Sequence, residues 1–171
     1  MSKKKIAIIS VAAVAAVALL ALLTVYLVSV FSPSDSGGKE STGKPIISAG
    51  TVTASAGDTV KVPIEFTGNP GAMGFLFDIS YDADSLEYIT YEKGELLSDC
   101  EVSGGNGALK LLSVENENIT DDGVMAYISF KVKDGASGDC AVKVICEENS
   151  VCNYDEESIA VETSDGKVTV K

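Results

Sequence analysis

The sequence contains no histidine, no arginine and no tryptophan, and each absence bears on a class of function. Without histidine, neither a Ser-His-Asp nor a Cys-His nucleophilic site can be assembled. A zinc site would have to use cysteine and carboxylate ligands alone, and none of the four cysteines forms a C-x-x-C pair. The sequence therefore predicts a protein that is not an enzyme and that holds no metal or cofactor of its own.

Paired carboxylates are the remaining catalytic candidate, because two acidic groups can support glycoside hydrolysis. Two pairs stand close in sequence, Asp82 with Asp84 and Asp121 with Asp122. Both pairs lie beside turn glycines or strand ends, where aspartate is common because it bonds to the local backbone. The D-x-D at Asp82 continues with Leu86 where a calcium loop needs a third ligand, so it is not an EF-hand loop.

The lack of tryptophan argues against a carbohydrate-binding function but does not exclude it. Modules that bind flat polysaccharides usually stack coplanar tryptophan or tyrosine rings on the sugars. Here Tyr127 alone lies on a clean outward alternation, and the other available rings are Tyr88, Tyr91 and Tyr154. A carbohydrate-binding β-sandwich module displayed at the cell surface is kept as the alternative function.

The acidic excess narrows the possible partners. All 25 acidic residues follow residue 31, where only ten of the 13 lysines lie, so this part carries 10 − 25 = −15 charges. Such a balance repels nucleic acid and anionic lipid headgroups. We therefore expect no nucleic-acid partner.

One long hydrophobic run, residues 6–31, contains no charged residue. As a helix it would be roughly 39 Å long at about 1.5 Å per residue, enough to cross an apolar core of about 30 Å. Residues 1–5 carry three lysines and the next lysine is Lys39, which places residues 1–5 in the cytoplasm and the rest outside. We predict a retained transmembrane signal anchor. The alternative is a cleaved signal peptide, with Ser32 and Ser34 as weak cleavage-site residues.

Residues 32–45 separate this run from the rest of the chain. They read SPSDSGGKESTGKP and include no large apolar residue, a composition typical of a flexible linker. As a random coil this linker would have an end-to-end distance of about 20 Å. We expect it to hold the following domain close to the membrane.

From residue 46 onward, short alternating runs predict strands. The clearest two lie in residues 59–82, where apolar and polar residues alternate on either side of a Gly-Asn-Pro-Gly turn. A period of two is that of a strand with one buried face. Similar runs recur roughly every 8–15 residues, which predicts one all-β sandwich or barrel domain, 46–171, of about nine strands.

Two positions in these runs bear on how the strands pair. Pro63 cannot donate a ladder hydrogen bond, so we expect it at a bulge, at a sheet edge, or where a strand changes sheets. In the run 123–133, strict alternation places Val124 and Ala126 inward and Met125 outward.

Several segments in this order resemble the cohesin domain of bacterial scaffold proteins, which build cellulosome-type complexes. The matching segments are GDTVKVPI at 57–64, GFLFDISYD at 74–82, SLE at 85–87, TDDGVMAYISFKVK at 120–133 and DGKVTV at 165–170. No single segment is decisive, but together they span nearly all of 46–171.

The resemblance implies a nine-stranded jelly-roll sandwich that binds a dockerin module on the sheet built from its third, fifth, sixth and eighth strands. It implies a non-catalytic cohesin, with calcium in the dockerin partner and none in this chain. With the predicted anchor, we expect a monomer displayed at the bacterial cell surface. The family's recognition positions fall at Gly74 and Leu76 on the third strand, and near Leu112, Val114 and Glu115 on the sixth. The best-known members are polar at the positions of Gly74 and Leu76, so the subtype of the partner is open.

The alternation of residues points to the same surface. Leu76 lies on the outward face of its strand, and Leu112 and Val114 share a face opposite to that of Leu111 and Ser113. These three outward apolar residues would form an exposed patch ringed by Asp78, Ser80 and Glu115, and such patches mark interaction sites. A covering loop, or an alternation displaced by one residue, would remove the patch.

The four cysteines all follow the hydrophobic run, where disulfides can form. Cys140 and Cys146 would lie on one strand about 20 Å apart, too far for a bridge. Cys146 and Cys152 could close a small loop, and free thiols are the alternative. A second bridge from Cys100 is doubtful.

Overall fold

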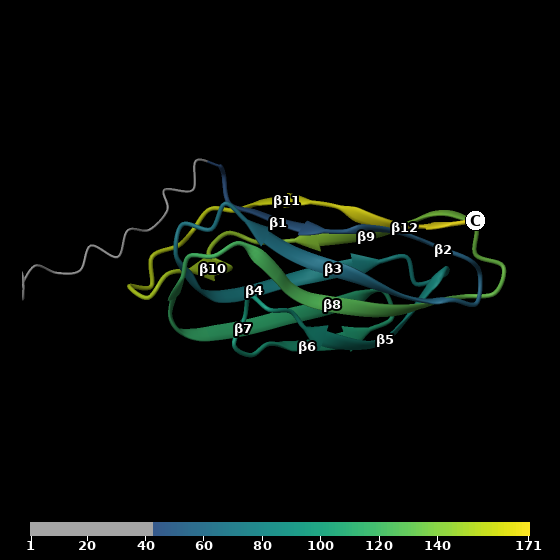
Figure 1. The fold of residues 1–171 in the computed structure, drawn as a ribbon, viewed down its shortest axis with the longest axis horizontal. Coiled ribbons are helices and arrows are strands. Elements are labelled where there is room, and N and C mark those ends of the chain that lie inside the picture. Colours follow the sequence, from purple (N-terminus) through teal and green to yellow (C-terminus); the bar gives the residue numbers. More distant parts are fainter. Residues whose placement is uncertain (1–42) are drawn as a thin grey trace, which may run out of the picture. The chain divides into compact units, whose positions relative to one another are not determined.

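A computed structural model describes residues 43–171, and these residues form strands and loops without a helix. None of this part of the chain could span a membrane as a helix. The predicted cytoplasmic segment 1–5, the membrane segment 6–31 and nearly all of the linker 32–45 lie outside the described residues. The predicted all-β sandwich is confirmed, because two sheets pack face to face around one core (Figure 1).

The first sheet has five strands in the spatial order β11-β1-β3-β8-β5. Neighbouring strands are antiparallel except β1 and β11, which are parallel. The strands of this five-stranded sheet are β1 (Ile46–Ala49), β3 (Thr59–Thr67), β5 (Leu86–Lys93), β8 (Gly123–Val132) and β11 (Glu162–Ser164).

The second sheet has seven strands, six of them in the order β2-β12-β9-β4-β7-β6 with β10 paired beside β4. This places the third, fifth, sixth and eighth predicted strands side by side in one sheet, as the resemblance implied. The strands of this seven-stranded sheet are β2 (Thr51–Ala54), β4 (Ala72–Tyr81), β6 (Glu101–Gly105), β7 (Ala108–Ile119), β9 (Gly138–Ile145), β10 (Val151–Cys152) and β12 (Gly166–Val170).

The two strongly alternating strands, β3 and β4, belong to different sheets and bury their apolar faces against each other. The ring of Phe66 on β3 meets the ring of Phe75 on β4 edge to face, with centroids 5.5 Å apart. Farther along the sandwich, Tyr81 on β4 packs on Phe130 of β8 with centroids 4.9 Å apart. The core is therefore an aromatic and aliphatic layer between the sheets, and each sheet keeps an outer face.

The described residues form twelve strands rather than the nine expected. The first predicted strand is divided at Gly50 into β1 and β2, which pair in different sheets. Pro63 explains the division, because it lacks an N–H, while its carbonyl accepts a 2.8 Å bond from the Gly50 N–H. Pro63 thus lies where a strand changes sheets, one of its three expected places. The short strands β10 and β11 come from the polar segment 146–165, where alternation is too brief to signal a strand.

Strict alternation fails once in β8. The pairing with β3 shifts between Ile64, opposite Ala126, and Glu65, opposite Val124, so Met125 is the extra residue of a bulge. A bulge places two consecutive side chains on the same side. Met125 and Ala126 are both buried, and the expectation that Met125 faces outward is wrong.

Candidate docking surface

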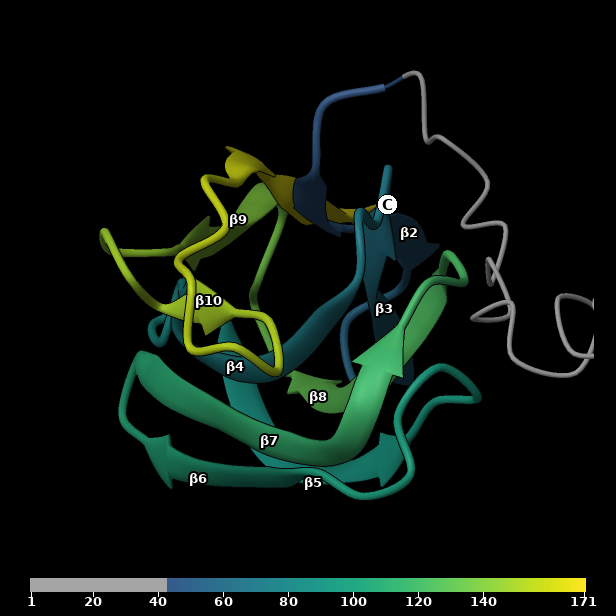
Figure 2. The same cartoon turned by 90° about the vertical axis from the view of Figure 1, so that its left-hand side faces the viewer.

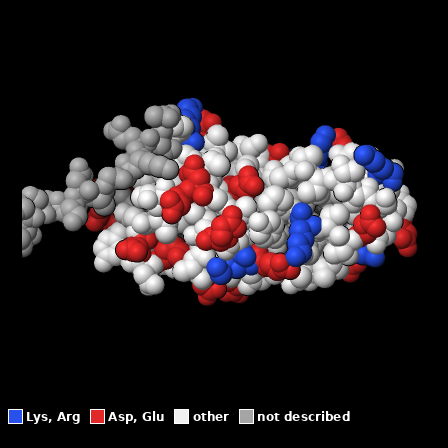
Figure 3. Space-filling view, in the orientation of Figure 1, with Lys and Arg blue, Asp and Glu red and all other residues white. Residues whose placement is uncertain are grey.

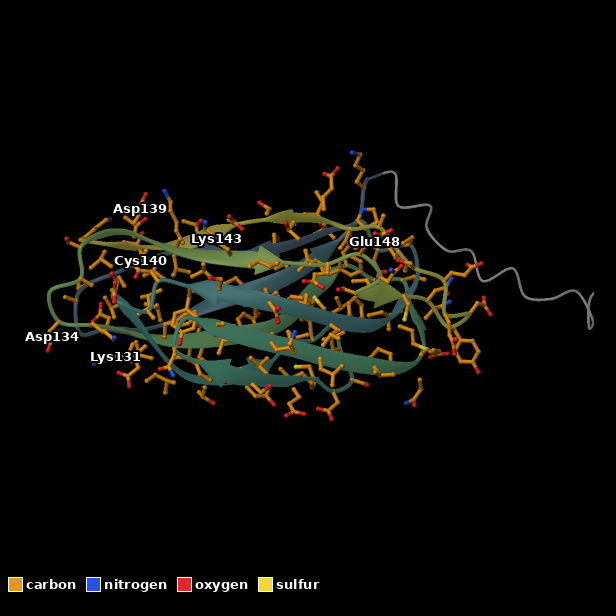
Figure 4. All side chains as sticks on the ribbon, turned by 180° about the vertical axis from the view of Figure 1, so that it is seen from behind. Lys131, Asp134, Asp139, Cys140, Lys143 and Glu148 are labelled. Carbon is orange, nitrogen blue, oxygen red and sulfur yellow. The ribbon has the colours of Figure 1, made fainter. Side chains whose placement is uncertain are left out.

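The outer face of the seven-stranded sheet carries four large apolar side chains in the open. Leu76 is 44% exposed, Leu112 44%, Val114 64% and Ile145 48%. They come from three adjacent strands, since β4 lies between β7 and β9. We call the outer face formed by β6, β7, β4 and β9 the docking surface. Figure 4 shows the molecule from behind the view of Figure 1, with Lys143 of β9 labelled.

The register of the ladder makes these side chains neighbours. Leu76 is directly opposite Leu112, and Gly74 is opposite Val114 one pair farther along. In the other direction, Asp78 is opposite Ile145 of β9. Directly opposite residues on one face have Cβ atoms about 4.5–5.5 Å apart, so Leu76 and Leu112 form one apolar ridge.

The sequence of β7 produces this surface by alternation. Its inward residues include Leu109 and Leu111, which are 2% and 0% exposed. The intervening Lys110, Leu112 and Val114 consequently point to solvent. No loop within residues 43–171 covers Leu76, Leu112 or Val114, and their predicted outward orientation is confirmed.

Two charged residues lie inside the docking surface and bind each other. Lys110 Nζ is 2.5 Å from Asp78 Oδ1, and the two residues are directly opposite on β7 and β4. In the next row, Ser80 lies between Ala108 of β7 and Lys143 of β9. Asp78 and Ser80 are half-buried, at the positions expected for the border of the apolar patch.

Gly74 is not exposed, which corrects its expected place on the open surface. Strand β10 lies beside β4 (Figure 2) and pairs with it antiparallel. Cys152 is directly opposite Gly74 in this pairing. A Cβ at Gly74 would lie 2.8 Å from Cys152 Sγ, so the thiol occupies the space above the glycine. Cys152 and Val114 both lie opposite Gly74, one on each side of β4, so Cys152 is also part of this surface. Sequence alternation could not identify it, because β10 has only two residues.

Glu115 is also buried, at 6% exposure, and does not border the patch as expected. It follows Val114 and therefore points inward, the opposite side from the recognition face. The Ser98 N–H lies 3.2 and 3.1 Å from its two carboxylate oxygens, and Ser113 Oγ lies 3.0 Å from Oε1. Burial raises the pKa of the Glu115 carboxyl, but these hydrogen bonds outweigh it and hold the pKa below its ordinary value. Glu115 thus fastens the segment before β6 to β7.

The cysteine pair Cys146–Cys152 does not form a disulfide, because all four thiols are free. On β4, Cys152 is opposite Gly74, while Cys146 follows Ile145, the partner of Asp78. Continuing that register places Cys146 beside Phe77, three residues from Gly74, or roughly 10 Å at about 3.3 Å per residue. That exceeds the limit of about 7 Å between bridged Cα atoms.

Of the four carboxylates considered as catalytic candidates, those of Asp82 and Asp122 accept hydrogen bonds from backbone N–H groups. Asp82 Oδ1 accepts a hydrogen bond from the Asp84 N–H at 3.1 Å. Asp122 Oδ1 accepts one from the Asn69 N–H at 2.9 Å, and the Asp121 carbonyl accepts one from Asn69 Nδ2 at 3.0 Å. Within residues 43–171, no three Cys, Asp or Glu side chains converge as metal ligands would.

The outer face of the five-stranded sheet differs in chemistry. It carries charged residues of both signs, among them Lys61 and Glu92, whose side chains form a 2.7 Å ion pair. Acidic and basic atoms are interspersed on the side of the molecule in Figure 3. Its Tyr127 is half-buried between Pro63 and Glu92, and its large exposed apolar residue is Ile89, 51% exposed.

The other tyrosines do not extend Tyr127 into an aromatic platform. Tyr88 and Tyr91 pack against the core, and Tyr154 lies in the loop after β10, where its N–H bonds to Asn118 Oδ1. In the part of the chain that the structure describes, the contiguous apolar surface is therefore the docking surface, and no row of rings suits a polysaccharide.

Comparison with known proteins agrees with this geometry. Residues 46–170 match a family described as the cohesin domain. The chain is 34% identical to cellulosomal-scaffolding protein A of Acetivibrio thermocellus in an alignment of length 139 that covers 72% of the chain. It spans only 8% of that protein's length.

Two solved structures show the same fold. One is the sixth cohesin of scaffoldin B from Acetivibrio cellulolyticus in complex with a Cel5 dockerin mutant, with a TM-score of 0.70 and 23% identity. That likeness covers 75% of this chain and all of the other. The second is the third cohesin ScaC of Acetivibrio cellulolyticus in complex with the ScaB dockerin, with a TM-score of 0.64 and 25% identity, covering 74% of this chain and 98% of that one.

Proposed function

The chain belongs to the cohesin family, and from this premise we propose that it binds the dockerin module of a polysaccharide-degrading enzyme or scaffold protein. Cohesin domains are non-catalytic protein-binding modules, so the role of residues 46–171 is assembly rather than chemistry. Dockerin complexes of two cohesins with this fold support the choice of partner.

The observation that carries the proposal is the exposed apolar ridge of Leu76, Leu112 and Val114 on adjacent strands of the seven-stranded sheet. A soluble domain rarely leaves such residues together unless they meet a partner. The surface has the anatomy of an interface, with an apolar centre and the polar side chains of Ser80 and Lys143 toward its border.

The mechanism is rigid docking of a helical partner on a sheet. The ladders on both sides of β4 hold the docking surface in place before the partner arrives, so little ordering entropy is lost on binding. Apolar contacts at the centre supply most of the affinity, and hydrogen bonds at the border fix the orientation.

We further propose that the protein is a single-pass membrane protein of the bacterial cell surface. Residues 6–31 would anchor it, residues 32–45 would act as a short tether, and the domain would capture its partner outside the cell as a monomer. Protease treatment of intact cells tests this location. We expect loss of the domain while a small fragment stays with the membrane, whereas full protection would contradict surface display.

Capture of the partner tests the proposed function. The full chain, immobilised in detergent, is incubated with the proteins that its host secretes. We expect it to retain proteins with a dockerin module and to release them when a chelator removes calcium, which the dockerin is expected to carry. The Leu76→Asp variant is the control and should retain less. Retardation of the chain in cellulose, xylan or starch gels, with no dockerin retained, would instead establish the carbohydrate alternative.

A further inference from the structure

The two opposite charges beside the apolar ridge, Asp78 and Lys110, neutralise each other. Asp78 and Lys110 lie opposite on β4 and β7, and their side chains are 43% and 53% exposed. Asp78 has Ile145 as its neighbour on β9, and the row beside the pair is the Leu76–Leu112 ridge. The ion pair is therefore part of the same surface that a partner would cover.

A closed ion pair restricts what a partner can place on top of it. A charged group of the partner would lose its water shell there and would meet a site of no net charge, because Asp78 and Lys110 neutralise each other. An uncharged group of the partner avoids this penalty. The pair consequently acts against charged partner residues more than it attracts them.

The apolar residues beside the pair are spaced so that side chains on one face of a helix can contact them. Leu76 and Leu112 stand across one strand-to-strand gap of about 4.8 Å, and Val114 follows Leu112 about 7 Å farther along β7. One turn of a helix rises about 5.4 Å, so side chains three and four residues apart on a helix can meet these neighbouring positions. From Ala108 to Val114 the exposed surface extends roughly 20 Å along β7, which corresponds to a helix of about 13 residues.

We propose that the partner's docking helix presents uncharged, apolar residues to Leu76, Leu112 and Val114, and that the Asp78–Lys110 pair stays closed beneath it. This inference rests on the dockerin-binding function proposed above and specifies the chemistry of the partner. The pair excludes helices that bring a charged side chain to the position beside the ridge. Partners are thus selected by apolar fit at the ridge and by the lack of charge beside it.

A charge exchange within the pair tests the inference. The probe is a recombinant dockerin from a protein that the full chain retains, and its Kd is measured by calorimetry with full-chain variants. Lys110→Ala leaves Asp78 unpaired under the partner and should weaken binding at least about fivefold. Asp78→Lys combined with Lys110→Asp restores a pair and should return the Kd to within about threefold of the native value.

The ion pair of Lys61 and Glu92 provides the matched control on the other sheet, with side chains 52% and 56% exposed. Exchanging those two charges should leave the Kd unchanged.

The outcomes separate this inference from the function on which it rests. If the exchanged pair binds as weakly as Lys110→Ala, the partner contacts the two charges individually, and the inference is wrong while dockerin binding stands. If no dockerin binds the native chain, the proposed function fails and this inference fails with it.

Discussion

Replacing Leu76 by aspartate is the substitution that most directly weakens the proposed interface. Leu76 is 44% exposed in the free chain, so docking can still bury that part of its side chain. Burying a whole leucine stabilises by about 1.5–3 kcal/mol, and the remaining part is worth about 0.7–1.3 kcal/mol. Partial desolvation of the new carboxylate adds a cost, which brings the expected loss to about 1–3 kcal/mol, or about 5- to 150-fold in Kd.

The same substitution should change the stability of the fold little. The Leu76 side chain packs on the surface of the sheet rather than in the core between the sheets, and its neighbours Leu112 and Asp78 are themselves partly exposed. We expect a loss of at most about 1 kcal/mol, which corresponds to a few degrees in Tm for a domain of this size.

Ile89→Asp is the matched control, because Ile89 is a similarly exposed apolar residue, at 51%, on the five-stranded sheet. The Kd for a recombinant dockerin is measured by calorimetry, and Tm by circular dichroism, for both variants. Only Leu76→Asp should weaken binding. Equal losses in the two variants, or unfolding of Leu76→Asp, would refute the assignment of Leu76 to an exposed docking surface.

Three further predictions concern the frame that supports this surface. Burial raises the pKa of the Glu115 carboxyl, but its hydrogen bonds outweigh burial and hold this pKa below the ordinary 4.5. The ionised carboxylate therefore stabilises the fold above about pH 4.5, and this contribution is lost as the pH falls through the folded-state pKa. Glu115→Gln should therefore lower the free energy of unfolding by about 1–3 kcal/mol at pH 7, and urea titrations should show the difference narrowing below about pH 4.5; a constant difference would contradict this role. Asn69→Ala should cost about 1–3 kcal/mol in the same assay, because Asn69 Oδ1 accepts the buried N–H groups of Gly71 and Ala72; a loss under 0.5 kcal/mol would show that water replaces these bonds. Alkylation of the unfolded, unreduced chain should label all four cysteines, because all four are free thiols. Labelling of only two would show that the other two form a disulfide.

Much of the docking surface could be predicted because alternation is regular over residues 75–81 of β4 and 108–115 of β7. Inward leucines and phenylalanines fix the orientation of the residues between them, and this placed Leu76, Leu112 and Val114 correctly. The same rule applied to β9, where Val142 and Val144 are buried, would also have identified Ile145 as exposed.

The predictions of exposed residues failed where contacts with other strands or segments decide whether a side chain is buried, because alternation within one strand does not reveal such contacts. Gly74 has the outward position expected of it, but β10 covers it with Cys152, a contact between residues far apart in the sequence. Glu115 came from the resemblance, and its own alternation with Val114 already indicated an inward side chain. A charged residue at an inward position is accepted here because the Ser98 N–H and the Ser113 hydroxyl bind it.

Strand number was underestimated for a related reason. The division of the first strand depends on Pro63 of β3, which lies next to Gly50 in space and not in sequence. The bulge at Met125 likewise results from pairing with β3 and leaves no mark in the alternation of β8 itself. Local pattern predicts strands and their faces, whereas pairing decides where they break.

The central claim is that a dockerin binds the outer face of the seven-stranded sheet, and methyl NMR of the full chain tests it most directly. Titration with the recombinant dockerin should shift or broaden the methyl signals of Leu76, Leu112, Val114 and Ile145, which are exposed on that face. The methyl signals of Ile89 on the other sheet should stay in place. Changes at Ile89 with the four docking-surface residues unaffected would contradict the account.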